Sequence, residues 1–192
     1  MYDGIAILGL NGSGKSTLAH ALAKSIGYRE MDVEDYYFPA QKTSRYMALE
    51  HRPSPLENTG VLPFSISLSK EDVQYNLISD IREYPRFILC GVTMNWCEEI
   101  LSKINVAFWI QTPKEERLKR IEQREFLRFG QRVLPGGDMY EQQKAFRETA
   151  AQRDLKSLEE NIHKLNCPVH IIDGTMSVQE NVHNMLRLLQ LD

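Results

Sequence analysis

A glycine-rich turn between an apolar run and a helix-forming segment is the feature that most constrains this chain. Residues 9–17 read GLNGSGKST and directly follow the apolar run IAIL at residues 5–8. The turn matches the spacing G-x-x-x-x-G-K-[ST] at four positions, Gly9, Gly14, Lys15 and Ser16. In this pattern the glycines let successive backbone N–H groups converge on phosphate oxygens, and the helix that follows adds the positive end of its dipole. The turn therefore predicts a triphosphate site between a strand and a helix.

The rest of the chain alternates apolar runs with segments of helical periodicity. The runs predict strands at residues 5–8, 28–32, 87–92, 106–110 and 169–172. Helices are expected at residues 16–26 and from Ser69, Thr112, Asp138 and Ser177. The helix at Thr112 has three agreeing start signals, with Thr as N-cap, Pro at N1 and Glu at N3. Strands that alternate with helices imply an α/β domain with a parallel sheet covered on both faces and ligands at the carboxyl ends of its strands.

Composition excludes several classes of protein. The 192 residues suit one domain, and a hydrophobic fraction of 42% allows a sizeable core. Lys and Arg total 23 against 26 Asp and Glu, and this balance argues against affinity for nucleic acid or a membrane surface through bulk positive charge. No apolar run approaches the roughly 20 residues that span a bilayer. The three cysteines have no metal-ligand spacing, so we expect reduced thiols in a cytoplasmic protein.

Four segments together carry a resemblance to a known family: GLNGSGKS, MDVEDYYF, TPKEERLKRIEQR and IIDGT. They resemble the small P-loop kinases, the superfamily of nucleoside monophosphate, shikimate, gluconate and nucleoside kinases. The resemblance covers nearly the whole chain and implies a three-layer α/β fold, with a five-stranded parallel sheet in the order 2-3-1-4-5 and a helical lid. It implies one domain over residues 1–192, with a substrate-binding insertion at about 38–80 and a lid at about 117–153. It also implies ATP, Mg²⁺ and a small-molecule phosphoryl acceptor.

On the donor side, the resemblance assigns the nucleotide to the glycine-rich turn. The expected contacts are Gly9, Asn11, Gly12, Ser13, Gly14, Lys15, Ser16 and Thr17. Lys15 would bridge the β- and γ-phosphates, and the Ser16 hydroxyl would ligate Mg²⁺. The loop Asp173, Gly174 and Thr175 resembles the one that lines the adenine in this family. A plain strand-to-helix turn is the alternative interpretation of that loop.

An arginine stripe follows the fourth predicted strand. Its members are Arg117, Arg120, Arg124 and Arg128, which fall within about 80° of helix circumference at 100° per residue. A solvated face paired with glutamates is the alternative, but arginine throughout favours planar contacts with phosphate. The resemblance places Arg120 on the nucleotide base and Arg124 on the phosphates. Arg128 and Arg132 would lie in the lid, with Arg147 or Arg153 on its far side, and Arg128 would act with Arg124 on the transferring phosphoryl group.

On the acceptor side, three acids end the second predicted strand: Asp32, Glu34 and Asp35. A hydroxyl acceptor needs a carboxylate that orients it and takes its proton. One alignment within the family makes Asp32 the metal contact and Glu34 a substrate contact, and another makes Asp35 the base; we favour Asp32 for metal and Asp35 for substrate. Helix capping by Asp32 is the structural alternative. The third strand, FILCGVTMN, has no acid at its end, so Asp32 is the available carboxylate for Mg²⁺.

Three functions remain open from the sequence. The leading hypothesis is ATP-dependent transfer to a hydroxyl of a small molecule. A nucleoside monophosphate kinase is the second, because Arg45 and Arg52 lie in the insertion and could bind an anionic acceptor. The third is an ATPase or switch module, for which we find no glutamine suited to position water.

Overall fold

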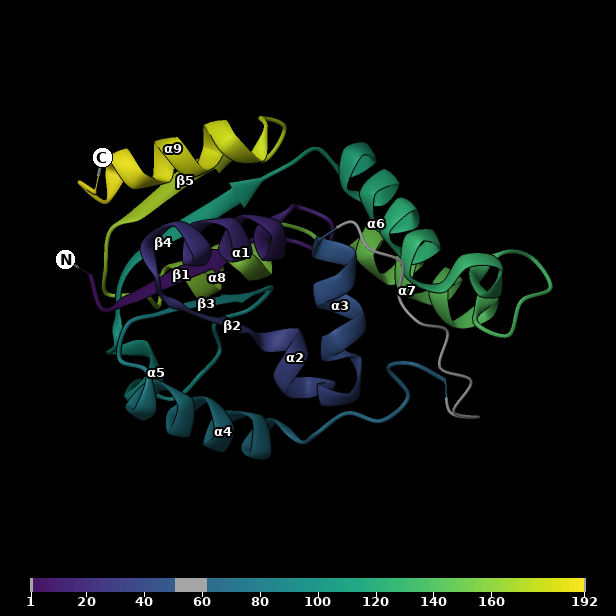
Figure 1. The fold of residues 1–192 in the computed structure, drawn as a ribbon, viewed down its shortest axis with the longest axis horizontal. Helices are drawn as coiled ribbons and strands as arrows, with labels where there is room; N and C mark the ends of the chain where they lie inside the picture. The colour runs from purple at the N-terminus through teal and green to yellow at the C-terminus, as the bar shows by residue number, and fades with distance from the viewer. Residues whose placement is uncertain (1, 51–61, 192) are drawn as a thin grey trace.

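A parallel sheet forms the centre of the molecule in the computed structural model, which describes residues 2–50 and 62–191 (Figure 1). Its strands are β1 (Gly4–Leu8), β2 (Arg29–Asp32), β3 (Phe87–Gly91), β4 (Ile104–Gln111) and β5 (Val169–Asp173). They lie in the order β2-β3-β1-β4-β5, and each neighbouring pair is parallel. This order confirms the predicted fold class. The carboxyl ends of all these strands therefore meet at one edge of the sheet, where ligands bind in folds of this kind.

Helices follow most strands. They are α1 (Lys15–Ile26), α2 (Val33–Tyr37), α3 (Lys42–Leu49), α4 (Lys70–Glu83), α5 (Glu98–Leu101), α6 (Lys114–Phe129), α7 (Tyr140–Gln152), α8 (Lys156–Ile162) and α9 (Val178–Leu188), with 3-10 turns η1 (Pro39–Gln41) and η2 (Gly130–Val133). The sequence predicted α1, α4, α6, α7 and α9. It did not predict the shorter α2, α3, α5 and α8. None of the helices in the described part of the chain combines the length and the apolar character needed to cross a membrane.

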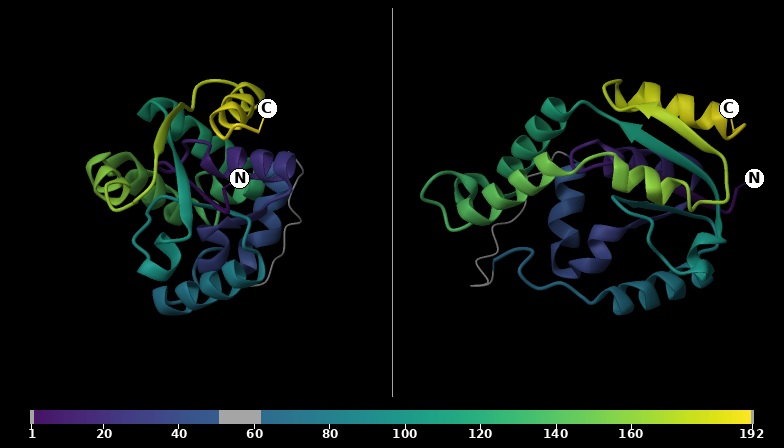
Figure 2. Two further views of the ribbon diagram at one scale, coloured as in Figure 1. Left: turned by 90° about the vertical axis from the view of Figure 1, so that its left-hand side faces the viewer. Right: turned by 180° about the vertical axis from the view of Figure 1, so that it is seen from behind.

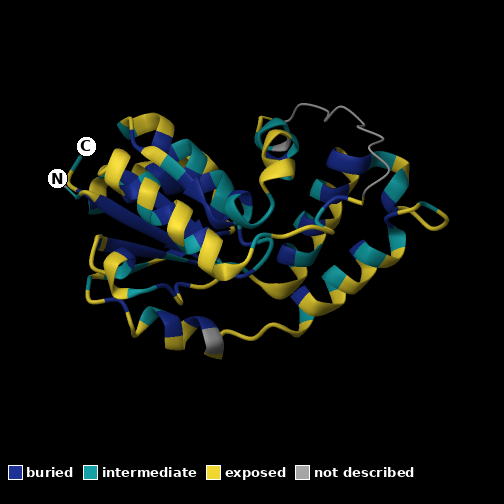
Figure 3. Ribbon diagram, turned by 90° about the horizontal axis from the view of Figure 1, so that it is seen from below, coloured by how far each residue is buried: buried dark blue, intermediate teal, exposed yellow. Residues whose placement is uncertain are grey.

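Two hydrophobic cores cover the opposite faces of the sheet, and both are buried (Figure 3). Side chains along a strand alternate between the faces, so Ile5 and Ile7 join one core while Ala6 and Leu8 join the other. The first core contains apolar residues of α1 and α9, and the second contains residues of α4, α5 and α8. Because both faces are covered, β1 is apolar at every position after its first glycine.

Helices α6 and α7 extend away from the sheet at its carboxyl edge (Figures 1 and 2). They pack against each other and against η2, and α3 contacts α6. A third, small core lies here, made of Phe129, Val133 and Met139 with Phe64 against them. Helices α6 and α7 with η2, here called the α6–α7 lobe, are therefore held together by apolar packing of their own.

The start of α6 differs from the prediction. Pro113 is the N-cap, without a side-chain hydrogen bond, and Thr112 lies outside the helix. The Thr112 hydroxyl instead donates to the backbone carbonyl of Ser13 at 3.0 Å. The predicted N-cap therefore ties the end of β4 to the glycine-rich turn, a long-range partner that local sequence signals do not reveal.

Candidate active site

The glycine-rich turn joins β1 to α1 at the carboxyl edge of the sheet. Gly12 and Gly14 have φ angles of 79° and 95°, which L side chains rarely adopt. A Cβ atom at Gly12 would lie 2.3 Å from the carbonyl oxygen of Arg117 on α6. Glycine is required there both by the backbone angle and by the close approach of α6. Gly14, a glycine of the predicted spacing, is required by its backbone angle, whereas Gly12 lies outside that spacing.

Lys15 begins α1 and is buried, with 8% of its surface exposed. It lines a cavity of about 460 Å³ together with Asp32 from β2 and Arg124 from α6. The first turn of α1 contains no acidic residue, so nothing in that turn offsets the positive end of the helix dipole. This corner of the cavity has the polarity that a phosphate group requires.

Asp32 is held at the junction of β2 and α2. It caps α2 by accepting the backbone N–H of Glu34 on Oδ1 at 2.9 Å, so the capping role foreseen as an alternative is present. Oδ2 lies 3.2 Å from Nη1 of Arg45, yet this buried atom has no hydrogen bond within the described chain. Burial acts to raise the pKa of Asp32, but the charges of Arg45 and Lys15 and the Ser16 hydroxyl outweigh it, so the pKa is lowered. Asp32 is therefore an anion with one oxygen to spare.

The residues around that oxygen suit Mg²⁺. A protein usually gives Mg²⁺ one or two oxygen ligands, and waters and substrate phosphates complete its octahedron. Oδ2 of Asp32, which has no hydrogen bond with the described residues although Nη1 of Arg45 lies 3.2 Å away, and the nearby Ser16 hydroxyl match this demand. The described residues contain no group of three acidic, His or Cys side chains that would form an all-protein cage.

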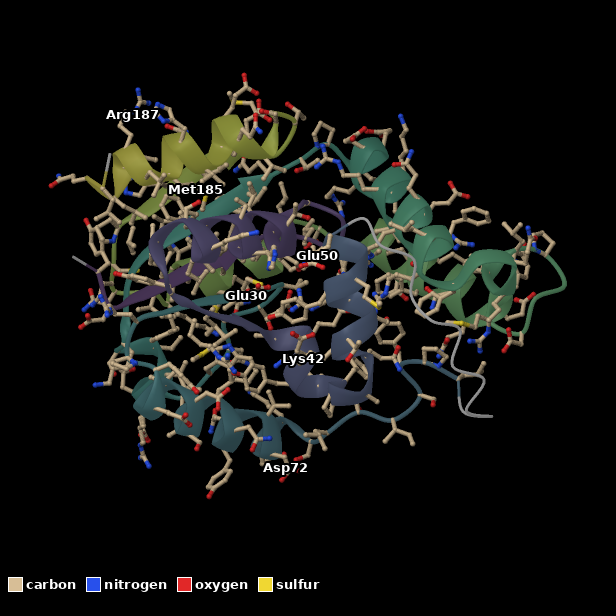
Figure 4. All side chains as sticks on the ribbon, in the orientation of Figure 1. Glu30, Lys42, Glu50, Asp72, Met185 and Arg187 are labelled. Atoms are coloured by element: carbon tan, nitrogen blue, oxygen red, sulfur yellow. The ribbon has the colours of Figure 1, made fainter. Side chains whose placement is uncertain are left out.

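Asp35 and Arg45 form a buried ion pair. The guanidinium of Arg45 on α3 donates through Nε to Oδ1 of Asp35 at 2.6 Å and through Nη2 to Oδ2. Glu30 on β2, which is labelled in Figure 4, lies 3.3 Å from Nη1 of Arg45 and contacts His20 of α1 at 2.8 Å. Neither Asp35 nor Arg45 lines the 460 Å³ cavity. Both predicted substrate contacts therefore lie behind the cavity wall, and Arg52, the other predicted contact, lies outside the described residues.

Glu34 reaches the cavity, as Asp32 does. It lines the cavity wall beside Asp32 and retains 32% side-chain exposure. Its Oε1 lies 3.9 Å from Nη1 of Arg128. Among the three predicted acids, Asp32 and Glu34 thus face the space where a ligand could lie.

The arginine stripe lies on one helix, α6, as predicted, but its members have different partners. Arg117 donates to the carbonyl of Asn11 at 3.0 Å, and Arg120 donates to the carbonyl of Gly174 at 2.9 Å. Arg120 also pairs with Glu116 at 2.8 Å. The first two arginines therefore hold the glycine-rich turn and the loop after β5.

The other two arginines of the stripe line the cavity. Arg128 donates to the Ser44 hydroxyl at 3.1 Å and lies over the ring of Phe64 at 5.0 Å. Burial lowers the pKa of Arg128 to about 10. Arg124 forms no hydrogen bond or ion pair with the described residues, and its Nε is buried. Arg124 thus has a buried guanidinium nitrogen without a hydrogen bond in the described chain, and it lines the same cavity as Lys15.

The loop after β5 lies against the glycine-rich turn. Oδ1 of Asp173 accepts the backbone N–H and the hydroxyl of Thr175 at 2.8 and 2.7 Å. A Cβ at Gly174 would lie 2.9 Å from the carbonyl oxygen of Ser13. The loop is a turn closed by Asp173, which is the alternative interpretation given above, and its contact with adenine stays a prediction.

Several cavity residues were missed by sequence reasoning. Polar ones come from α6 and α7: Glu125, Gln142 and Gln143. Aromatic ones come from distant segments: Phe64, Phe129 and Phe146. Arg153, considered for the far side of the lid, donates to Oδ1 of Asn11 at 2.7 Å. Apart from the neighbouring stripe, no motif marks these positions, because helix packing brings them together.

Comparison with known proteins identifies one relative in sequence and several in structure. No family model matches the chain. The uncharacterized protein YqaC of Bacillus subtilis (strain 168) is 31% identical over 197 residues, which cover 98% of each chain. Shikimate kinase from Bacteroides thetaiotaomicron superposes with a TM-score of 0.55 at 13% identity over 98% of each chain. Deoxyadenosine kinase from M. mycoides gives 0.54 at 15% identity over 97% of this chain and 98% of that one.

A sugar kinase from Janibacter sp. HTCC2649 has the same arrangement, with a TM-score of 0.51 at 13% identity over 100% of this chain and 96% of that one. Because these identities are low, the superpositions show similarity of the fold alone. The sheet order and the helices on both faces are those of this group. The chain therefore belongs to the family of YqaC and has the fold of the P-loop kinases.

Proposed function

We propose that the protein is an ATP-dependent kinase that transfers the γ-phosphate to a hydroxyl of a small molecule. The observation that carries the proposal is that Lys15, Asp32 and Arg124 line one cavity. This cavity unites a phosphate-binding turn, a spare carboxylate oxygen and an unpaired arginine. Its volume, about 460 Å³, lies within the range of small-molecule sites. The names of the similar structures, which are sugar, shikimate and deoxyadenosine kinases, support the same class.

On the donor side, the N–H groups of the glycine-rich turn and Lys15 hold the triphosphate. Ser16 and Asp32 would hold Mg²⁺, which neutralises charge on the phosphates when bound. Arg124 adds charge at the transferring phosphoryl group, because its Nε has no hydrogen-bond partner in the described chain, although its charge also acts on the neighbouring Glu125 carboxyl. Arg120 and the loop at residues 173–175 lie on the base side of the nucleotide.

On the acceptor side, Glu34 orients the hydroxyl and takes its proton. A loose phosphoryl-transfer transition state needs positioning more than a strong base, so a carboxylate at the cavity wall is sufficient. Asp35, the base favoured by the sequence, has both oxygens bound by Arg45 and lies outside the cavity. In this proposal Asp35 is a positioning residue that fixes Arg45 and, through it, Asp32.

The same geometry disfavours a nucleoside monophosphate as acceptor. Arg45 is 4% exposed and has Glu30, Asp32 and Asp35 around it, so it cannot offer its charge to a phosphate. Glu34 and Glu125 in the cavity would repel an anionic acceptor. A bare ATPase would not need aromatic walls that exclude water beyond the phosphate site. Transfer to a neutral hydroxyl accounts for more of the cavity.

The test is acceptor-dependent formation of ADP. Purified protein with ATP and Mg²⁺ is incubated with sugars, nucleosides, shikimate, gluconate and nucleoside monophosphates in turn. We expect at least one hydroxyl compound to accelerate ADP formation well above the rate without acceptor. Lys15→Ala should abolish this rate, and Lys24→Ala, which removes an exposed lysine from the same helix, should not. Equal rates for the wild type and Lys15→Ala would refute the assignment of the triphosphate.

A further inference from the structure

Two buried side-chain oxygens at the α6–α7 side of the cavity have no hydrogen-bond partner in the described chain. One is Oε1 of Glu125, a residue only 2% exposed. The other is Oε1 of Gln142. Both residues line the cavity. Buried polar atoms are normally paired, so two unpaired acceptors on one wall call for an explanation.

Neither side chain is free to turn away, because its other polar atom is engaged. Oε2 of Glu125 accepts from Nη1 of Arg147 at 2.9 Å. Nε2 of Gln142 donates to the carbonyl of Pro63 at 2.9 Å. The two contacts fix the orientation of the carboxylate and the amide. The unpaired oxygens are therefore held in place before any ligand arrives, as a preformed site requires.

The neighbouring Gln143 adds a third polar group. It is 4% exposed and lines the cavity. Burial raises the pKa of Glu125, although Arg147 and the nearby Arg124 act to lower it. The carboxylate is thus less solvated than it would be in water, and a donor from a ligand would stabilise it.

Aromatic rings form other parts of the same cavity wall. Phe38 and Phe64 meet edge to face with their centroids 5.3 Å apart, and Phe64 meets Phe129 at 6.1 Å. All three rings line the cavity. Rings of this kind bury the flat or apolar faces of a cyclic ligand. The wall therefore combines hydrogen-bond acceptors with surfaces for a ring.

We infer that Glu125 and Gln142 select an uncharged, ring-bearing acceptor through its hydrogen-bond donors. The inference rests on the proposed function, and it narrows the substrate to a cyclic compound that offers O–H or N–H groups besides the hydroxyl that is phosphorylated. Sugars would supply O–H donors and nucleosides would supply both kinds. Acceptors with a carboxylate or phosphate at this wall are rejected, because they would place a second anion beside Glu125.

The test is direct binding to the wild-type protein by calorimetry. The neutral probes are D-ribose, D-glucose, deoxyadenosine and cytidine, and the anionic probes are gluconate, shikimate and AMP. We expect a neutral probe to bind best. Best binding by a sugar would show that O–H donors alone are sufficient, and best binding by a nucleoside would show that N–H donors contribute. Glu125→Gln should weaken that probe roughly tenfold to a hundredfold, the scale for a hydrogen bond to a charged group. ATP affinity and the unfolding temperature should stay close to wild type.

Glu122→Gln is the matched control, since Glu122 is exposed on the same helix. Gln142→Leu removes the second oxygen at a half-buried position and provides the test should Glu125→Gln fail to fold. Preferred binding of gluconate, shikimate or AMP would overturn the inference, as would unchanged affinity in both variants. Binding that depends on Glu125 without any ADP formation would leave the site standing and reject the kinase. Fast ADP formation with an anionic acceptor would support the kinase and overturn the inference about Glu125 and Gln142.

Discussion

At the scale of single residues, Arg124 is the cation whose role depends most on a ligand. It lines the cavity and has no described partner. Arg124→Ala should lower kcat by about 10³–10⁵-fold, as for other arginines supplied to a phosphoryl transition state, and weaken ATP binding far less. Arg124→Lys should rescue little, because a point charge lacks the fork of the guanidinium. Lys119→Ala, at an exposed position of α6, serves as the control in steady-state kinetics.

Asp32 gives a prediction about pH. Its pKa is lowered from an ordinary 3.8 in the folded protein, so the folded state binds fewer protons than the unfolded chain near that pH. Its stabilising contribution is complete above the ordinary value and is lost as the pH falls through the folded value. Urea unfolding should therefore find Asp32→Asn less stable than wild type at pH 7, with a smaller gap near pH 3. A gap that widens on acidification, or one matched by the exposed Asp154→Asn, would contradict this account.

Sequence reasoning at this scale succeeded where chemistry is local. The turn at residues 9–17 joins β1 to α1 as expected, because its glycines allow the backbone path, and its binding of phosphate stays a prediction. Asp35 and Arg45 were expected at the substrate, but they pair with each other across ten positions. Glu125 and Gln142 were not foreseen, because their environment arises only when α6 and α7 pack. Residues whose role depends on partners from other elements carry no local signal.

At the scale of elements, α3 is tied to the sheet by one side chain. Arg45 joins α3 to Asp35 on α2 and to Glu30 and Asp32 on β2. Arg45→Met leaves three buried acids without their cation and should lower the free energy of unfolding by about 3–5 kcal/mol. Lys42→Met, at an exposed position of the same helix, is the control. A loss below about 1 kcal/mol in urea unfolding, the scale of a surface pair, would show that the cluster does not hold α3.

The contact between the glycine-rich turn and α6 can be tested at Gly12. Gly12→Ala places a Cβ 2.3 Å from the carbonyl oxygen of Arg117, so the turn must shift away from α6. We expect a clear loss of ATP affinity, measured by calorimetry. Gly136→Ala carries the same left-handed backbone penalty, with φ 89° but no neighbouring atom within 4 Å. It should cost stability without weakening ATP, and equal ATP affinities in the two variants would contradict the proposed contact.

The elements that could be predicted are those with local signals of their own. Helix α9 has a complete capping box at Ser177 and Glu180, and α4 has the Ser69 cap. Most strands are apolar runs, and the predicted ends of the strands lie within two residues of the observed ends. Helices α2, α3, α5 and α8 are short, and α3 is fixed by the buried Arg45, so their periodicity is too weak to detect. Thr112 gave a correct helix start to within two residues but a wrong cap, because its hydroxyl has a partner in the turn.

At the scale of the whole molecule, the sheet and the α6–α7 lobe have separate tasks. Helices α6 and α7 extend beyond one edge of the sheet (Figure 2). Asp32 at that edge and Arg124, Arg128, Glu125 and Gln142 of the two helices line the same cavity. The division of the chain into a substrate insertion and a lid remains a prediction. The fold persists at 13–15% identity to the similar kinases, because a parallel sheet needs only apolar strands, whereas the choice of acceptor that we propose depends on particular side chains at residues 125 and 142.

The most direct test of the central claim is to identify where the γ-phosphate goes. Phosphorus NMR would follow ATP and Mg²⁺ with the protein and the acceptor that best accelerates ADP formation. The account predicts that the signal of a new phosphate monoester grows in equal amount with ADP, and that neither grows with Lys15→Ala. Inorganic phosphate that grows in equal amount with ADP, without any phosphate ester, would contradict the account and make the protein an ATPase.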